Sequence, residues 1–349
     1  MNAAATGTRK PLTVAVVGAT GAVGHEFLAV LEQRNFPIGT LKLLASKRSA
    51  GQKLRFGGRE QVIEEMTEQS FAGVDVAFFS AGGPISKSHG PIAAAAGAVV
   101  VDNSSAFRMD PKCPLVVPEV NPEAMAGIRL GQPGGAIIAN PNCSTIIMLM
   151  AVNPIRQAAG VSRIVVSTYQ AASGAGAAAM EELRSQTVDV LAGKPAQPKI
   201  FPQQYAFNIF SHNSAMQPDG YNQEEVKMVK ESHRIWGDSA VGITATCVRV
   251  PVMRAHAESV NLTLKKPLGE AEALEVLKRA PGVTVIDDRG NNRFPTPLDA
   301  SHKDDVLVGR VRTDHSQPGG VGLNLFVCGD QLRKGAALNA VQIAELLLR

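Results

Sequence analysis

The chain has 349 residues, of which 45% are hydrophobic and 19% charged, so it can bury the core of one large domain or two ordinary ones. Its net charge of +4 is small and spread along the chain, which argues against a nucleic-acid partner, and no apolar run approaches the ~18 residues of a membrane span. Because the first residues, "MNAAATGTRKPL", lack the apolar segment of a secretion signal, we expect a cytoplasmic protein.

The first element is predicted at 12–17, where the apolar strand "LTVAVV" runs into the glycine turn "GATGAVG" and then into a helical pattern. Gly18, Gly21 and Gly24 would let the backbone approach a pyrophosphate whose charge faces the helix N-terminus. The spacing is GxxGxxG rather than the usual GxGxxG, and a tight turn without a ligand is the alternative. The other residues of the turn are also candidates for cofactor binding: Thr20, Ala22 and Val23.

The end of the second predicted strand, in "LLASKRSAG", bears on the choice between the two nicotinamide cofactors. An NAD site usually carries an acidic residue there, which binds the ribose 2′-hydroxyl. This chain has Ser46, Lys47, Arg48 and Ser49 instead. Hydroxyl and cationic groups suit a 2′-phosphate, so the segment favours NADP(H), with Arg48 and Ser49 as candidate contacts. A solvated basic loop is the alternative.

Further along this half of the chain, apolar strand-like segments alternate with segments predicted to be helical. Helix is predicted in "SKSHGPIAAAAGA", and strands are predicted in "VDVAFFSAGG", "AVVVDNSS", "PLVVPEVN" and "GAIIANPNC". Apolar strands that alternate with helices indicate a parallel sheet covered on both faces. We therefore predict an α/β fold that begins with a Rossmann-like dinucleotide-binding domain.

The pattern changes after residue 143. Strand-like segments there include "RIVVSTYQAASG", "GITATCVRVPV", "ESVNLTLKK", "GVTVID" and "DVLVGRVRTD", and "AGAAAMEELRSQTVDVLAG" and "LGEAEALEVLKRA" are helical. This predicts an α+β catalytic and dimerisation domain with a mixed sheet over 142–329. The final amphipathic pattern, "KGAALNAVQIAELLLR", is expected to return to the first domain, which would then comprise 1–141 and 330–349.

One of the four cysteines stands in a distinctive place. Asn142 is a plausible N-cap for the apolar helix that follows, so Cys143 would sit in its first turn. The positive end of the helix dipole there lowers the pKa of a thiol and favours a nucleophilic thiolate. A buried structural cysteine is the alternative. The cysteines are far apart and form no CxxC or Cys/His cluster, so neither a disulfide set nor a metal site is expected.

A reactive thiol beside a nicotinamide implies that an acyl group is captured as a thioester and then reduced by hydride. That chemistry needs a proton shuttle, and histidine suits the task. Of the seven histidines, His256 lies at the start of an alternating strand, on the face of Val260, Leu262 and Leu264. This spacing gives it only a modest preference, and a hydrogen-bonded core histidine is the alternative.

Motifs along nearly the whole chain resemble those of the aspartate-semialdehyde dehydrogenase family. They occur in the family's order and are "GATGAVG", "SAGG", "DNSSAFR", "VPEVN", "NPNCST", "YQAASGAG", "RVPVMRAHAE" and "LRKGAA". The resemblance implies a cytoplasmic or plastid homodimer that uses NADPH to reduce L-aspartyl 4-phosphate to L-aspartate 4-semialdehyde and releases inorganic phosphate. This step supplies the synthesis of lysine, by way of diaminopimelate, and of threonine, methionine and isoleucine.

The resemblance also implies roles for the reacting groups. Cys143 matches the acyl-thioester nucleophile, His256 the general acid/base, and Gln170 the side chain that orients the substrate at the thiol. Arg249 matches the guanidinium that binds the substrate carboxylate, for which a bidentate fork is suited.

Further substrate and cofactor contacts are implied in the same way. Glu224 would meet the substrate ammonium, and Lys227, on the same helical face, would meet the phosphate together with Arg108 and Asn103. An exposed helical ion pair is the alternative for Glu224 and Lys227. Ser173 and Gly174 match residues of the family's loop that reaches the nicotinamide. Gln331 is a further cofactor contact, at a position where the family often has asparagine.

Two other readings of the chain stay open. N-acetylglutamyl-phosphate reductases have similar domains and chemistry, but their cysteine motif usually reads like "NPGCYPT" where this chain has "NPNCST". The "SCTTN" signature of phosphorylating glyceraldehyde 3-phosphate dehydrogenases is absent from the sequence. From a different class, the chain could be a non-catalytic NADP-binding regulator.

Overall fold

The computed structural model describes residues 11–349, which divide into two compact units. The first unit comprises residues up to Pro114, Met125–Ala139 and Ala340–Arg349, and the second comprises Leu115–Ala124 and Asn140–Asn339. The domain limits expected from the sequence stay a prediction. The compact units differ from them at 115–124 and at 330–339, both of which cluster with the second unit.

The first unit is built on a seven-stranded sheet with β1 at its centre. The strand order is β3-β4-β2-β1-β5-β6-β7, and each pair is parallel except the hairpin β3–β4 at one edge. The strands are β1 (Leu12–Val17), β2 (Ile38–Ala45), β3 (Lys53–Phe56), β4 (Arg59–Glu65), β5 (Val76–Phe79), β6 (Val99–Asp102) and β7 (Ala136–Ala139).

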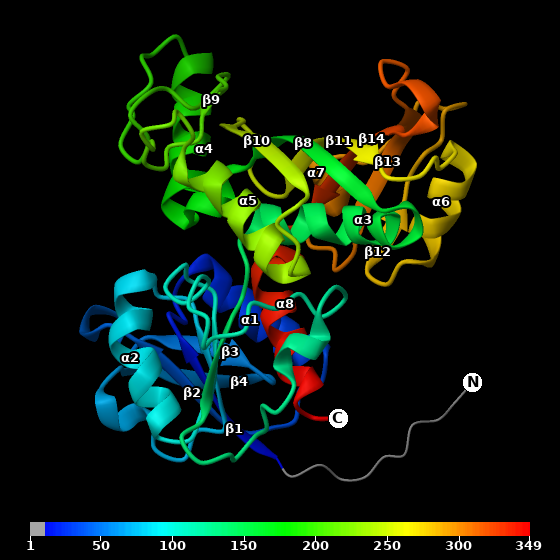
Figure 1. Ribbon diagram of the computed structural model, residues 1–349. Helices are drawn as coiled ribbons and strands as arrows, with labels where there is room; N and C mark the ends of the chain where they lie inside the picture. Colours follow the sequence, from blue (N-terminus) through cyan, green and yellow to red (C-terminus); the bar gives the residue numbers. More distant parts are fainter. Residues whose placement is uncertain (1–10) are drawn as a thin grey trace. The chain divides into compact units, whose positions relative to one another are not determined.

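Helices cover both faces of this sheet, which explains why its central strands are apolar along their whole length. Helix α1 (Ala22–Gln33) leads from β1 to β2, and α2 (Gly83–Ala95) leads from β5 to β6, toward the opposite edge. Right-handed crossovers in opposite directions place these two helices on opposite faces, as Figure 1 shows. Arg34, which ends α1, pairs with Glu345 of the C-terminal helix at 2.6 Å.

Two features of the first 140 residues differ from the sequence-based expectation. The segment "PLVVPEVN" forms no named strand, because Pro114 and Pro118 have no N–H group to contribute to a sheet. Instead, the Asn121 side chain bonds to the backbone of the preceding residues, accepting from Val117 N at 2.9 Å and donating to Leu115 O at 2.9 Å. The hairpin β3–β4 was not anticipated.

The second unit contains a seven-stranded mixed sheet with the order β12-β13-β14-β11-β8-β10-β9. The pairs β8–β10 and β12–β13 are parallel and the others are antiparallel. The strands are β8 (Val161–Gln170), β9 (Phe210–Ser211), β10 (Gly242–Arg249), β11 (His256–Leu264), β12 (Val283–Val285), β13 (Val306–Thr313) and β14 (Gly322–Gly329).

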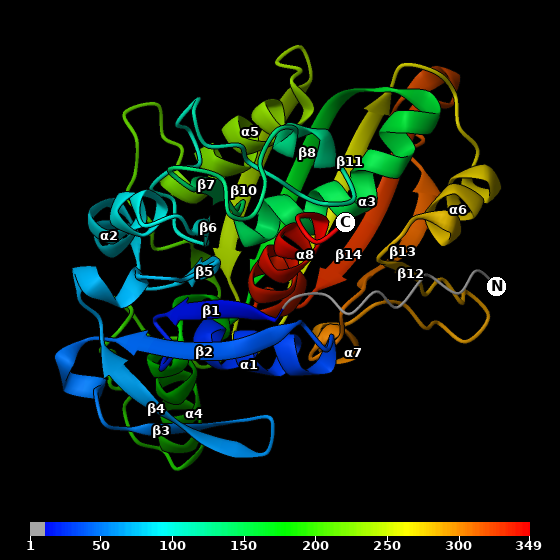
Figure 2. The same ribbon diagram turned by 90° about the horizontal axis from the view of Figure 1, so that it is seen from below.

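One face of this second sheet is covered by helices. Helix α3 (Cys143–Ala159) crosses β8, β11, β13 and β14, α5 (Gln223–Trp236) packs on β10, and α6 (Glu270–Arg279) packs on β12 and β13. Figure 2 shows α3 and α6 over the long strands. Residues on this face of β11 are buried at every second position, from His256 to Leu264. Two further helices complete the unit: α4 (Ala177–Leu191) and α7 (Pro297–Ala300).

The end of the chain is helical, and only its last turns have a partly exposed face. A short π-helical segment, Arg333–Ala337, leads into α8 (Leu338–Leu346), and residues 330–341 are buried on every side. The expected amphipathic face is therefore confined to the last turns, where Gln342 and Glu345 are half-buried, because Arg333 and Lys334 are buried and paired with Asp304 and Glu119.

The predicted fold class is confirmed: a Rossmann-like domain and an α+β domain with a mixed sheet. Within residues 11–349, every helix is too short or too polar to cross a membrane.

Candidate active site

The glycine turn of the first unit is required by packing. Gly18 has φ +84°, and a Cβ there would lie 2.4 Å from the carbonyl oxygen of Ser80. A Cβ on Gly24 would lie 2.4 Å from Gly18 O, so α1 approaches the turn more closely than any other residue allows. Thr20 and Gly21 are exposed, and Gly21 is the N-cap of α1. The turn thus presents backbone at a helix N-terminus, which suits a pyrophosphate.

The remaining turn residues, Ala22 and Val23, are half-buried at the start of α1. The basic segment after β2 forms a 3-10 turn, Lys47–Ser49, in which Lys47 and Arg48 are exposed and Ser49 is buried. Two exposed cations at the end of a parallel strand fit a phosphate group carried by the ribose.

Two of the expected phosphate ligands also lie in the first unit and touch each other. Asn103 directly follows β6, and Arg108, only 8% exposed, donates from Nη2 to the Asn103 carbonyl at 2.8 Å. The Oδ1 and Nδ2 atoms of Asn103 are buried and have no hydrogen-bond partner among residues 11–349. An unsatisfied buried amide beside a guanidinium is what a site for a polar ligand requires.

In the second unit, Cys143 opens α3 as predicted. Asn142 is the N-cap, and its Oδ1 accepts from the N–H groups of Ser144 at 3.0 Å and Thr145 at 3.2 Å. Cys143 is half-buried, whereas Cys247 and Cys328 are fully buried within strands. The thiol therefore lies at a capped helix start and remains accessible, which is the setting expected of a nucleophile.

A buried carboxylate fixes this helix start from the side. Glu224 Oε1 accepts from Asn142 Nδ2 at 2.8 Å and from Gln170 Nε2 at 3.4 Å, and its Oε2 pairs with Lys227 Nζ at 3.0 Å. Glu224 is only 5% exposed, so the alternative of an exposed ion pair is wrong. Burial alone would raise the pKa of Glu224, but Lys227, His212 and Asn142 outweigh it and lower the pKa to about 2.

The ends of three neighbouring strands bring the other candidate residues together. Arg249 pairs with Gln170 in the register of β10 and β8, and Ala257 pairs with Tyr169, which brings the adjoining His256 beside Gln170. We call Arg249, Gln170 and His256 the first row. Gln170 also donates from Nε2 to Ser144 Oγ at 2.9 Å, so it contacts the residue that follows the thiol.

His256 is fully buried and neutral. Its Nδ1 accepts from the N–H of Ala171 at 3.1 Å, and its Nε2 has no partner within the described part of the chain. Burial, and then the positive charge of Arg249, lower the pKa of His256 to about 3. With Nδ1 acting as an acceptor, the neutral ring carries its proton on Nε2, so it offers an N–H donor.

Arg249 is held by both polar and aromatic neighbours. It donates from Nε to Asn213 Oδ1 at 3.2 Å and from Nη1 to Ala171 O at 3.3 Å, and its guanidinium lies 5.7 Å from the centre of the Phe201 ring. Burial lowers the pKa of Arg249, yet an arginine stays charged in a protein. This buried cation suits a carboxylate ligand.

The loop after β8 packs on this row. A Cβ on Gly174 would lie 3.0 Å from His256 Cε1 and 3.3 Å from Arg249 Nη1, so only glycine fits without displacing them. Ser173 Oγ accepts from Gln331 Nε2, and Gln331 Oε1 accepts from the Ala255 N–H at 2.9 Å. The amide of Gln331 therefore joins this loop to the residue before His256. Its expected contact with the cofactor stays a prediction.

Sequence reasoning missed several residues of this site. Asn213 lies in a loop without a recognisable motif, whereas Ser144 directly follows the cysteine and could have been included. His212 also lies here, half-buried, and loss of solvent contact lowers its pKa to about 4. The proximity of Asn142 to Glu224 could not be read from residues so far apart in the sequence.

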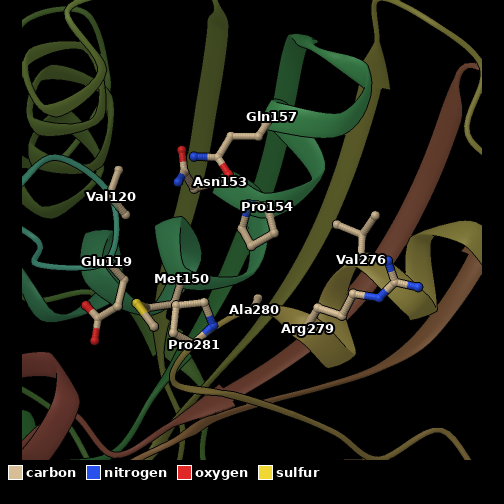
Figure 3. Close-up of a pocket in the computed structure, with 10 residues that line it drawn as sticks. All are labelled: Glu119, Val120, Met150, Asn153, Pro154, Gln157, Val276, Arg279, Ala280 and Pro281. Atoms are coloured by element: carbon tan, nitrogen blue, oxygen red, sulfur yellow. The ribbon is translucent and has the colours of Figure 1, made fainter. Parts of the chain in front are cut away.

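A separate cavity of about 300 Å³ contains none of the predicted site residues. It lies between α3 and α6, with Met150, Pro154, Arg279 and Glu119 among its lining, as Figure 3 shows. Among residues 11–349, no three His, Cys, Asp or Glu side chains gather as metal ligands would.

Two family models match the chain. Residues 13–128 match the semialdehyde dehydrogenase NAD binding domain, and residues 152–334 match the semialdehyde dehydrogenase dimerisation domain. These ranges fall largely in the first and second units, respectively.

Several known proteins similar to nearly the whole chain are named aspartate-semialdehyde dehydrogenase. The aspartate-semialdehyde dehydrogenase of Synechocystis sp. is 54% identical over 97% of this chain and 98% of its own length, and that of Aquifex aeolicus is 52% identical over 96% and 98%. The crystal structure of aspartate semialdehyde dehydrogenase II from Vibrio cholerae, complexed with ASA, is 48% identical and has a TM-score of 0.93, covering 98% of this chain and 99% of that one. The resemblance seen in the motifs is thereby confirmed, and the chain belongs to the aspartate-semialdehyde dehydrogenase family.

Proposed function

We propose that this enzyme uses NADPH to convert L-aspartyl 4-phosphate to L-aspartate 4-semialdehyde and inorganic phosphate through a thioester on Cys143. Its full-length relatives are aspartate-semialdehyde dehydrogenases, which places it in amino-acid biosynthesis. The observation that carries the mechanism is the capped helix start at Cys143, with Gln170 bonded to Ser144 and His256 beside Gln170 in the same unit.

The substrate is held by charge. Arg249 binds the α-carboxylate through its guanidinium fork, and Glu224, ionised because its pKa is about 2, attracts the ammonium group. Lys227, which is 31% exposed, keeps N–H donors for the phosphate. Arg108 and Asn103 keep their predicted role as phosphate ligands, supported by the unsatisfied amide of Asn103.

The thiolate of Cys143 attacks the acyl carbon, a carbon–sulfur bond forms, and the carbon–oxygen bond to phosphate breaks. The nicotinamide, when bound, supplies a hydride to the acyl carbon of the resulting thioester. His256 donates from Nε2–H to the oxygen on which negative charge develops, and Gln170 keeps the acyl group beside the sulfur. Collapse of the hemithioacetal then returns the thiolate and releases the aldehyde.

The decisive experiment is to measure NADPH oxidation with aspartyl phosphate, alongside N-acetylglutamyl phosphate as the competing substrate. We expect turnover with aspartyl phosphate alone, and Cys143→Ala should reduce kcat by at least about a thousandfold. Cys328→Ala is the matched control, because it removes a buried thiol outside the site. Turnover retained by Cys143→Ala would disprove the thioester. If iodoacetamide alkylates Cys143 only slowly, and substrate does not change that rate, the result would point to a non-catalytic regulator.

NADP(H) is the proposed cofactor because Lys47 and Arg48 are exposed at the end of β2. Replacing both by alanine should weaken NADPH binding by about tenfold or more and leave NADH binding nearly unchanged. Kinetics with the two cofactors side by side test this, and an unchanged ratio of kcat/KM values would remove the argument for a 2′-phosphate site. Lys53→Ala is a suitable control, because Lys53 is also exposed but already pairs with Glu60, and its removal should leave the preference for NADPH unchanged.

Two further statements belong to the proposal. The match of residues 152–334 to a dimerisation domain supports a homodimer, which sedimentation would test. A cytoplasmic location rests on membership of the family.

A further inference from the structure

A second row of polar side chains lies behind the first row. In the register of the mixed sheet, Cys247 pairs with Thr168, Thr168 pairs with Glu258, and Glu258 pairs with Val327. These residues stand two positions along their strands from Arg249, Gln170, His256 and Gly329 respectively, and therefore on the same face. We call Cys247, Thr168 and Glu258 the second row.

This row is polar where its surroundings predict an apolar core. Cys247, Thr168 and Glu258 are each 0% exposed. The next row of the same face contains only aliphatic side chains, with Val166 paired to Ala245 and to Val260. A glutamate at such a depth is rare unless its carboxyl group has partners.

The structure shows no such partners. Neither Glu258 oxygen nor Thr168 Oγ1 has a hydrogen-bond partner anywhere in the described range, 11–349. These three polar atoms lie on directly opposed residues, so one shared ligand could form hydrogen bonds with all of them. A buried water molecule typically makes about three hydrogen bonds. Cβ atoms of opposed residues lie about 5 Å apart, so one water molecule can reach both side chains.

Burial also favours the protonated form of the Glu258 carboxyl group. Burial raises the pKa of Glu258 well above its usual range. The strands and helix packed against β11 are β8, β14 and α3, whose ionisable residues are Arg163, Tyr169, Cys328, Cys143 and Arg156. None of these forms a salt bridge with Glu258 in the structure of residues 11–349, and β10 adds only Cys247 and Arg249. Glu258 can therefore donate one hydrogen bond and accept others.

We propose that Glu258 and Thr168 bind an internal water molecule, and that Glu258 through this water is a positioning residue for His256. Its action on His256 rests on the proposed function. Glu258 stands two residues beyond His256 on β11, about 6.6 Å along the strand, which is within the span of one side chain and one water. Because Nδ1 of His256 already accepts from Ala171 and Nε2–H is kept for the substrate, the hydrated pair acts by packing beneath the imidazole ring, where its own hydrogen bonds make it rigid.

The water itself is tested first, without any assay of activity. A high-resolution crystal structure of the full-length protein should show an ordered water within about 3.2 Å of both Glu258 and Thr168 Oγ1. Dry side chains, or a direct hydrogen bond between them, would overturn the proposal even if the enzyme turns over as expected.

Isosteric variants then test the effect on His256. Thr168→Val and Glu258→Leu should lose the water and lower kcat by about tenfold or more, with KM within about twofold. Thr168→Ser and Glu258→Gln keep a hydrogen-bonding group and should retain both the water and at least about half of kcat. The conservative pair keeps the test valid if Glu258→Leu does not fold.

Val327→Ala is the matched control, because Val327 is a buried apolar residue directly opposite Glu258 in the sheet. It should lower stability and leave kcat within about twofold. If Val327→Ala lowers kcat as much as Thr168→Val does, the effect is one of packing and the positioning role is refuted.

Discussion

Asn142 links three parts of the site with one side chain. Its Oδ1 caps α3, and its Nδ2 donates to Glu224, which also accepts from Gln170. The residue next to the thiol therefore sets both the direction of the helix N-terminus and the position of a buried carboxylate. A capping residue matters more here than on a surface helix, because each of its bonds is buried.

Asn142→Ala should lower the free energy of unfolding by about 1–2 kcal/mol, since the cap is lost and a buried bond to Glu224 is removed. Alkylation of Cys143 by iodoacetamide should slow, because the first turn of α3 is no longer fixed. Urea unfolding and the alkylation rate measure the two effects.

Asn142→Ser is the control for this prediction, since serine caps a helix but is too short to replace the whole amide. It should recover most of the stability. If Asn142→Ala unfolds at the same urea concentration as the wild-type enzyme, the cap contributes nothing and the thiol is positioned by other contacts.

At the residue scale, the sequence predicted what depends on neighbours along the chain. The cap at Asn142 and the place of Cys143 follow from the order of residues, and both are observed. The burial of Glu224 and the position of Glu258 depend on strand register and helix packing, which local sequence patterns do not reveal. Gln331 shows the same limit, because its bond to Ala255 joins residues that are far apart in sequence.

Among the elements, the strand–turn–helix of the first unit has the strictest requirement for small residues. Gly24→Ala would place a Cβ 2.4 Å from Gly18 O and 2.5 Å from Ala19 O, both backbone atoms. Because backbone atoms cannot shift without a large energetic cost, we expect the free energy of unfolding to fall by about 3 kcal/mol, or the variant not to fold. Thermal unfolding measures this loss.

Gly83→Ala provides the comparison, since Gly83 begins α2 and a Cβ there meets no atom within 4 Å in the described structure. It should be neutral or stabilise the protein by up to about 1 kcal/mol, because alanine favours helix. Equal losses from the two variants would show that close approach is not the reason for Gly24.

Elements with strong patterns were predicted and those with weak patterns were not. The apolar runs of β1, β5 and β6 stand out because both faces of a parallel sheet are buried. The polar hairpin β3–β4 lies at a sheet edge, where alternation is weak. The segment at Pro114–Asn121 is apolar enough for a strand, but its prolines and the Asn121 side chain decide otherwise.

For the whole molecule, pH should act on stability in two opposite directions. His256 and His212 have pKa values lowered from 6.5 to about 3 and about 4. Below pH 6.5 the unfolded chain binds protons at these positions while the folded chain does not, so stability falls as the pH drops from 6.5 toward 4. The loss is up to about 1.4 kcal/mol per pH unit for each histidine.

The contribution of Glu258 to stability changes with pH in the opposite direction. Its pKa is raised in the folded state, so above its ordinary value of 4.5 the unfolded chain releases a proton that the folded chain retains. Stability from this group therefore falls as the pH rises. Glu258→Gln removes the effect, and its stability relative to the wild-type enzyme should increase as the pH rises above 4.5, by up to about 1.4 kcal/mol per pH unit.

Urea unfolding at several pH values tests both signs at once. The Glu225→Gln variant is a useful comparison, because Glu225 is also buried but accepts hydrogen bonds from Asn222 N and Cys247 N. If the wild-type and Glu258→Gln curves stay parallel above pH 4.5, Glu258 is ionised in the folded protein.

Gly335 stands where the chain, near its end, comes back to the nucleophile: any added carbon there would lie 2.8 Å from the Cys143 Cβ. A side chain at position 335 would therefore displace Cys143, although almost two hundred residues separate the two positions. A random-mutagenesis screen for loss of activity should therefore return hits at codon 335 as readily as within the cysteine motif. A reader of such a screen who looked only at the motif would mistake those hits for damage to an ordinary terminal helix.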